Sequence, residues 1–165
     1  MSSLQRDIID IRLDETTIAR GNPIVQRERK TAIDALLEEN QCRILTSDLP
    51  HQAPFKAALS VQETRLIFTL TCALDNDHSF AIPLRAVARH MKEYFEICDA
   101  HYMAVREGNH SKIEAIDMGR RGLHDEGGHL INRVLSNQVE IDFATARRLF
   151  SLICVLRSGT HGPRF

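Results

Sequence analysis

Three apolar runs separated by very short connections limit the topologies open to this 165-residue chain. They are FKAALSVQ from residue 55, RLIFTLTCAL from residue 65 and SFAI from residue 79. Alternating and β-branched apolar residues are typical of strands, and the turn signal DNDH separates the last two runs. Parallel pairing would need a crossover of about a dozen residues, which these connections cannot supply. The sequence therefore predicts an antiparallel meander.

A strand and a helix are predicted before this meander. The run DIIDIRLDE (7–15) has the apolar pattern of a half-buried strand. Asn22 and Pro23 then give a helix cap followed by a proline at the first helical position. Helical spacing of apolar residues ends near Asn40, and the charged segment RERK within it is interpreted as the solvated face. The segment CRIL (42–45) is interpreted as a loop or a short edge strand.

Two further helices are predicted after the meander. Pro83 begins the first, whose apolar residues follow the i, i+3, i+4, i+7 rule of an amphipathic helix. The segment EGNH breaks this pattern, and Ser111 with Glu114 forms a capping box that predicts a new helix start. A bend or break is expected at Gly127-Gly128. The segment QVEI that follows this helix is a candidate for a short strand.

The last helix is expected to lie at the centre of the molecule. Asp142 is its predicted N-cap, and the residues that follow are apolar nearly all round, as in a buried helix. Residues 157–165 are interpreted as a frayed tail. The predicted fold class is α+β, with a small, mainly antiparallel sheet packed against a helical layer that contains a central, buried C-terminal helix.

Length and composition fit a single domain spanning residues 1–165. A chain of this size buries about 70% of its unfolded surface, so its 43% of hydrophobic residues can form a core without disulfides or bound metals. The four cysteines include no CxxC pair and are interpreted as buried reduced thiols. The sequence shows neither a signal-peptide core nor an apolar run of about 20 residues, which predicts a cytoplasmic protein without a membrane partner. The formal net charge of -1 gives no global attraction to nucleic acid.

Several segments along the chain are similar to those of a known bacterial family. In order, they are LDETTIARGNPIVQRERKTAIDALLEEN, LSVQETRLIF, KEYFEICDAHYMAVR, IEAIDMGRRGLHDEG and EIDFATARRLFSLICVL. Together they resemble UPF0262, an uncharacterised family found mainly in alphaproteobacteria, over almost the whole chain. The resemblance implies a small cytosolic protein without an assigned activity. It therefore transfers no catalytic residue to this sequence.

The segment IEAIDMGRRGLHDEGGHL (113–130) concentrates side chains that can bind or catalyse. Its HDEGGH part is similar to the zinc motif HExxH, in which histidines four apart share one helical face. His124 and His129 are five apart, which places them about 140° apart around a helix. A helix break at the two glycines would be needed to bring them together, with Glu126 as a third ligand or a base. We expect no metal here and interpret the histidines as surface residues near a helix end.

The arginines of the same segment allow two interpretations. GRRG resembles the GxxG loop of KH domains, which clamps a nucleic-acid backbone, but Asp125 stands where that pattern has an isoleucine. In an unbroken helix, Arg121 would lie one turn from both Asp117 and Asp125, forming a ladder of ion pairs. Gly119 and Gly122 would then allow another helix to approach closely. We favour this structural interpretation.

A second arginine pair, Arg147 and Arg148, lies on the otherwise apolar last helix. Charges on a buried helix need either charged partners or a solvent-filled cleft, and acids such as Glu114 or Asp117 are candidate partners. The functional alternative is an anion pocket where arginines of both pairs converge with a histidine, because arginine forks suit phosphate. The candidate ligand-binding residues are therefore Arg120, Arg121, His124, Glu126 and Arg147.

The favoured function is that of a non-enzymatic binding or regulatory protein with an arginine-rich helical face. Its partner would be an RNA, a phosphorylated ligand or an acidic protein surface. The sequence contains no GxSxG elbow, Walker loop or GxGxxG motif, so no catalytic residue is assigned and no cofactor is expected. Two alternatives stay open. One is a small hydrolase using His124, Glu126 and His129 with or without a metal. The other is a structural or regulatory homo-oligomer, such as a homodimer with Gly119 and Gly122 in its interface.

Overall fold

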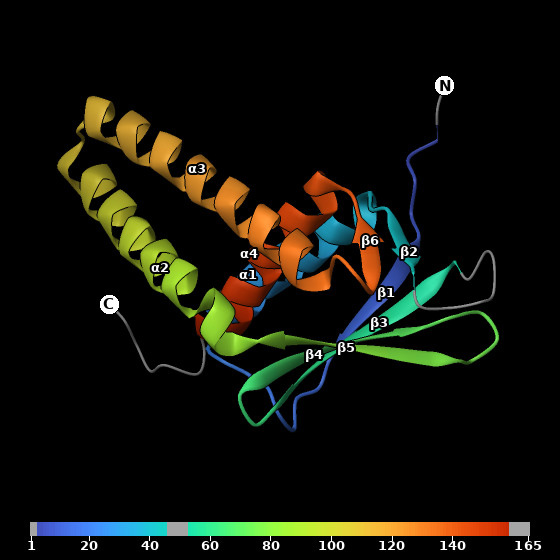
Figure 1. Cartoon of the computed structure of the whole chain (residues 1–165). Helices are drawn as coiled ribbons and strands as arrows, with labels where there is room; N and C mark the ends of the chain where they lie inside the picture. Colours follow the sequence, from blue (N-terminus) through green and yellow to red (C-terminus); the bar gives the residue numbers. More distant parts are fainter. Residues whose placement is uncertain (1–2, 46–52, 159–165) are drawn as a thin grey trace.

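The computed structural model of the chain describes residues 3–45 and 53–158 (Figure 1). Within these ranges, four helices and a mixed four-stranded sheet form an α+β fold, which confirms the predicted class. The elements are β1 (Ile8–Leu13), α1 (Pro23–Glu38), β2 (Cys42–Ile44), β3 (Phe55–Gln62), β4 (Arg65–Thr71), β5 (Asp77–Pro83), α2 (Leu84–Glu107), α3 (His110–Leu135), β6 (Val139–Ile141) and α4 (Phe143–Ser158).

The main sheet has the strand order β1-β3-β4-β5. Strands β3, β4 and β5 pair antiparallel in sequence order, so the predicted meander is confirmed. Leu59, Phe68 and Phe80 lie opposite one another across these strands and are all buried. Strand β1 adds to β3 in parallel, which makes the sheet mixed. Strands β2 and β6 pair antiparallel in a separate two-stranded sheet, so CRIL and QVEI do form short strands.

Helix α1 begins as predicted, because the Asn22 side chain accepts a hydrogen bond from the Val25 backbone N–H and Pro23 follows it. The interpretation of RERK as a solvated face is wrong for one residue. Arg29 is only 6% exposed, whereas Arg27, Glu28 and Lys30 are exposed. Arg29 lies on the buried side of α1, and its long side chain reaches backbone carbonyls there.

Helices α2 and α3 form a long antiparallel hairpin whose far end projects away from the rest of the molecule (Figure 1). Gly108 ends α2 in the left-handed conformation that favours glycine. Asn109 then caps α3 by accepting a hydrogen bond from the Lys112 backbone N–H. The predicted capping box at Ser111 and Glu114 is therefore wrong, because an asparagine two residues earlier caps the helix.

Helix α3 continues without a break through Gly127-Gly128, contrary to the expected bend. Both glycines are buried where α3 packs against α4. A Cβ on Gly127 would clash with the Phe150 ring, and one on Gly128 would lie 2.8 Å from Cγ of Arg147. Gly119 and Gly122, which we expected to allow close helix packing, have no neighbouring atom within 4 Å of an added Cβ. The close approach is therefore made one to two turns later than predicted.

Helix α4 is the central helix that the sequence predicts. The Asp142 side chain accepts a hydrogen bond from the Thr145 backbone N–H, which confirms its cap. Helix α4 contacts both α1 and α3, and its side chains are buried almost continuously from Leu152 to Leu156. The helix extends to Ser158, so the first two residues of the predicted tail are helical, and residues 159–165 lie outside the described residues. None of the described helices has the length and apolar character of a membrane span.

Candidate functional site

Packing of α2, α3 and α4 surrounds His124 with aromatic rings. His124 of α3 is half-buried, and its ring stacks on Tyr94 of α2 with 5.7 Å between centroids. Phe150 of α4 meets the same imidazole edge-on at 6.1 Å. The Nε2 atom of His124 is buried and has no hydrogen-bond partner within residues 3–45 and 53–158. His124 is thus a packed residue in the middle of a helix, and its interpretation as a surface histidine near a helix end is wrong.

Two guanidinium groups give this position its electrostatic character. Burial is the largest cause that lowers the pKa of His124, followed by the positive charges of Arg147 and Arg120. Asp125 raises the pKa, but its effect is the smallest of the four. Both arginines therefore act on the pKa of His124 more strongly than Asp125 does.

Each of these arginines also has an acidic partner. Arg120 Nη2 lies 2.7 Å from Asp117 Oδ1 on the same helix. Arg147 Nε lies 2.8 Å from Asp125 Oδ1, in an ion pair whose angle departs from that of a hydrogen bond, so this buried N–H stays unsatisfied. The predicted ladder through Arg121 is wrong, because the acids pair at i+3 and across to α4 instead. Arg121 is exposed and makes no ion pair in the described part of the chain.

The second arginine of α4 is used for helix packing. Arg148 donates a hydrogen bond from Nη1 to the Glu39 backbone carbonyl, 2.9 Å away, near the end of α1. The sequence offered Glu114 or Asp117 as partners of the α4 arginines. That expectation is wrong for both arginines, because Arg147 pairs with Asp125 and Arg148 binds a neutral carbonyl.

The residues of the hydrolase alternative do not come together. Glu126 is exposed and its Oε2 lies 3.7 Å from Nε2 of His90 on α2. His129 is exposed and stacks on Phe143, with 4.6 Å between ring centroids. Because α3 is unbroken, His124 and His129 stay on different sides of the helix. No group of three or more metal-binding side chains occurs among the residues that the structure describes.

Sequence reasoning missed the aromatic and histidine neighbours of this site. His90 meets the ring of Phe150 edge-on at 6.3 Å, and its Nδ1 is buried without a hydrogen-bond partner in the described ranges. Tyr94 stands on the predicted apolar stripe of α2, so its inward direction could be predicted. Its stacking on His124 could not, because helical spacing does not reveal which helix faces that stripe.

Of the four thiols, Cys98 lies closest to this site, because it hydrogen-bonds Tyr94 and lies in the field of Arg120. All four cysteines are free, with Cys42, Cys72 and Cys154 buried and Cys98 half-buried. Burial, and secondarily the charge of Asp7, raises the pKa of Cys42 to about 12. Burial also raises the pKa of Cys154 and Cys98. The interpretation as buried reduced thiols is confirmed for Cys42, Cys72 and Cys154. The raised pKa values make Cys42, Cys98 and Cys154 poor nucleophiles.

The lowered pKa of His124 predicts pH-dependent stability. In the unfolded chain its pKa is near the ordinary value of 6.5, so on acidification the unfolded state takes up a proton first. The free energy of unfolding should therefore fall as the pH drops below about 6.5 and level off below the folded-state pKa. Urea denaturation between about pH 7.5 and pH 5.5 measures this fall. His124→Gln should reduce it and the exposed control His129→Gln should not, whereas equal pH dependence in wild type and His124→Gln would contradict the prediction.

These features define a small α+β protein in which a long helical hairpin holds a half-buried histidine beside two guanidinium groups. The chain belongs to UPF0262, because the model of this uncharacterised protein family matches residues 5–158. It is 46% identical to the UPF0262 protein of Brucella anthropi over 153 residues, which cover 90% of this chain and 92% of the relative. It is 44% identical to the UPF0262 protein of Rhodospirillum rubrum over 152 residues, or 92% of each chain. The resemblance found in the sequence is thereby confirmed. No solved structure matches the chain.

Proposed function

We propose that this chain is a cytoplasmic, non-enzymatic binding protein that recognises an anionic group through the cationic residues around His124. The single observation that carries the proposal is the placement of two arginines around the half-buried His124: Arg120 lies one turn before it on α3, and Arg147 of α4 pairs with the adjacent Asp125. After burial, these two positive charges are the main causes that lower the pKa of His124. The buried Nε2 of His124 lacks a hydrogen-bond partner in the described residues, whereas Arg147 Nε already lies 2.8 Å from the Asp125 carboxylate. Buried polar groups without partners cost free energy that a bound oxyanion would offset.

A compact phosphorylated ligand fits these side chains better than an RNA. Only Arg120, Arg121 and Arg147 among the candidate residues are cationic, and acids lie beside them. Affinity for a nucleic-acid backbone rests on many cation–phosphate contacts, whereas the formal net charge of this chain is -1. A single phosphoryl group needs only one or two guanidinium forks and a histidine donor. Exposed Arg121, which has no acid partner in the described chain, would extend the site toward solvent.

The proposal predicts that inorganic phosphate raises the pKa of His124. A bound anion stabilises the imidazolium form, so binding couples to proton uptake and is tighter at lower pH. NMR titration of the His124 ring signals, with and without phosphate, measures both pKa values. Arg147→Gln should weaken phosphate binding about tenfold or more, the loss typical of a charge-assisted hydrogen bond. Arg133→Gln, an exposed arginine later on α3, is the matched control and should bind as wild type does.

An unchanged His124 pKa at saturating phosphate, or equal affinities of the Arg147 and Arg133 variants, would contradict this function. Gel-shift titration with single-stranded RNA at low salt tests the RNA version separately. The homo-oligomer predicted from the sequence stays a prediction. Its measurement is the mass in solution of the wild-type chain and of a Gly122→Leu variant, since a Cβ added at Gly122 has no atom of the described residues within 4 Å.

A further inference from the structure

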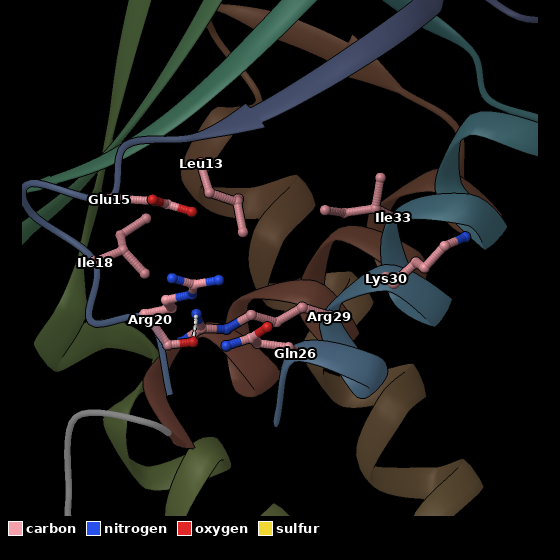
Figure 2. A pocket seen from close by; sticks show the side chains of 8 residues that line it. All are labelled: Leu13, Glu15, Ile18, Arg20, Gln26, Arg29, Lys30 and Ile33. Carbon is pink, nitrogen blue, oxygen red and sulfur yellow. Dashed lines mark hydrogen bonds between the residues drawn. The ribbon is translucent and has the colours of Figure 1, made fainter. Parts of the chain in front are cut away.

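A pocket of about 270 Å³ lies between α1 and the segment that follows β1 (Figure 2). Its volume is close to the lower end of the range for small-molecule sites, roughly 300–1,000 Å³. Three aliphatic side chains, Leu13, Ile18 and Ile33, form apolar walls. Figure 2 shows Arg20 reaching into the pocket from the segment after β1, and Arg29 reaching into it from α1. The pocket therefore combines apolar walls with two guanidinium groups.

Arg29 is a buried cation whose hydrogen bonds are incomplete. Its Nη1 donates to the Arg20 backbone carbonyl at 2.8 Å, and its Nη2 donates to the Leu156 carbonyl at 3.1 Å. Its Nε is buried without a partner among the described residues. Burial lowers the pKa of Arg29, but a guanidinium stays protonated in proteins. Both partners are neutral carbonyls, so they hold the side chain in place without neutralising its charge.

The other charged residues of the pocket do not balance Arg29. No carboxylate in the described ranges lies within ion-pair distance of Arg29 or Arg20. Lys30 is already paired with Asp34, with 2.7 Å between Nζ and Oδ2. Glu15 lines the pocket and raises the pKa of Arg29, but only through its field. With two unpaired guanidinium groups and one carboxylate, the pocket has an excess of one positive charge.

We propose that this pocket binds a small organic monocarboxylate. The carboxylate would accept hydrogen bonds from the guanidinium groups of Arg29 and Arg20, which suit its two oxygens. The apolar body of the ligand would pack on Ile18 and the other aliphatic walls. A single negative charge neutralises the excess, whereas a phosphate dianion would overcompensate it and face Glu15. An inorganic anion without an apolar part would leave the aliphatic walls exposed to water.

This inference goes beyond the proposed function, because the pocket shares no residue with the cationic cluster around His124. Through its two carbonyl contacts, Arg29 joins the segment after β1 to the end of α4. These neutral partners leave its charge without a counter-ion, and Arg20 adds a second unpaired guanidinium to the same pocket. A carboxylate ligand would give both guanidinium groups a counter-ion.

Sodium hexanoate is the probe, with hexanamide as its uncharged counterpart. NMR titration of the full-length, isotope-labelled chain follows the Nε–H signal of Arg29 and the backbone amides of the pocket residues. Hexanoate should move these signals with a dissociation constant in the millimolar to high-micromolar range expected of a ligand this small, and hexanamide should bind at least tenfold more weakly. Hexyl phosphate should also bind more weakly than hexanoate. No movement of the Arg29 signal, or equal affinity for hexanoate and hexanamide, overturns the proposal.

Variants separate this pocket from a general surface effect. Arg20→Gln should lower the hexanoate affinity about tenfold or more, because it removes one charged donor. Arg27→Gln is the matched control and should bind as wild type, because Arg27 is an exposed arginine of α1 that does not line the pocket. Arg121→Glu on α3 should leave hexanoate binding unchanged, so failure of one site is distinguishable from failure of the other. An equal loss of affinity in Arg27→Gln and Arg20→Gln would overturn the assignment to this pocket.

Discussion

Replacing Gly127 by alanine is expected to lower the free energy of unfolding by roughly 2 to 3 kcal/mol. The added Cβ would clash with the ring of Phe150, which is fully buried in α4 and has no room to move aside. Alanine is the better helix former by about 1 kcal/mol, but this gain offsets only part of the overpacking. Urea denaturation followed by circular dichroism measures the difference.

The matched controls for this prediction lie on the same helix. Gly119→Ala and Gly122→Ala add the same methyl group where no atom lies within 4 Å. Each should raise the free energy of unfolding by up to about 1 kcal/mol, because only the helix-propensity term changes. A Gly127→Ala variant as stable as these two would mean that α3 and α4 are not packed as the structure has them.

Replacing Asn40 by alanine is expected to cost about 3 kcal/mol of unfolding free energy. Asn40 is 1% exposed, and its Oδ1 accepts a hydrogen bond from the Ile8 backbone N–H at 2.6 Å. Its Nδ2 donates to the Ile8 carbonyl at 2.9 Å and to the Leu36 carbonyl at 3.0 Å. One side chain thus satisfies both backbone groups of a buried strand residue and one carbonyl near the end of α1. Alanine would leave all three without a side-chain partner, and each buried polar group without a hydrogen bond costs free energy.

Chemical denaturation of the Asn40→Ala variant, together with amide hydrogen exchange of β1, measures this effect. Exchange at the Ile8 amide should accelerate more than exchange at β4, since Ile8 loses its acceptor directly. Asn137→Ala is the control, because Asn137 is exposed in the turn before β6 and its substitution should change stability by less than about 0.5 kcal/mol. Equal stabilities of the two variants would contradict the role given to Asn40.

The features that could be predicted from the sequence are those with a local cause. The meander follows from connection length, and the start of α1 follows from Asn22 and Pro23. Competition between local signals explains the wrong cap of α3, because Asn109 and Ser111 are both good N-cap residues. The expected break at Gly127-Gly128 had a sound local reason, since glycine weakens a helix. Close packing on Phe150 outweighs that weakness, and a local pattern does not reveal it.

The candidate site was predicted in part for the same reason. The sequence indicated that Arg120, His124 and Arg147 could converge, but not that Asp125 reaches across to Arg147. Contacts between helices depend on how the helices pack, which no spacing rule specifies. The burial of Arg29 was missed because a charged run is usually solvated, whereas the carbonyls of Arg20 and Leu156 bind its guanidinium. Like Arg147 and Arg148, Arg29 has a partner far away along the chain, which spacing does not reveal.

The parallel pairing of β1 with β3 determines the order in which the sheet can assemble. Strands β3, β4 and β5 meet through short connections, so their pairing closes small loops at little entropic cost. Strand β1 emerges first during synthesis, yet its partner begins only at Phe55, after α1 and β2 have been made. The contacts of β1 therefore have the largest sequence separation in the sheet, and contacts of this kind form slowly. Asn40, which binds Ile8 from the end of α1, gives this strand a contact at shorter sequence separation than its sheet pairing with β3.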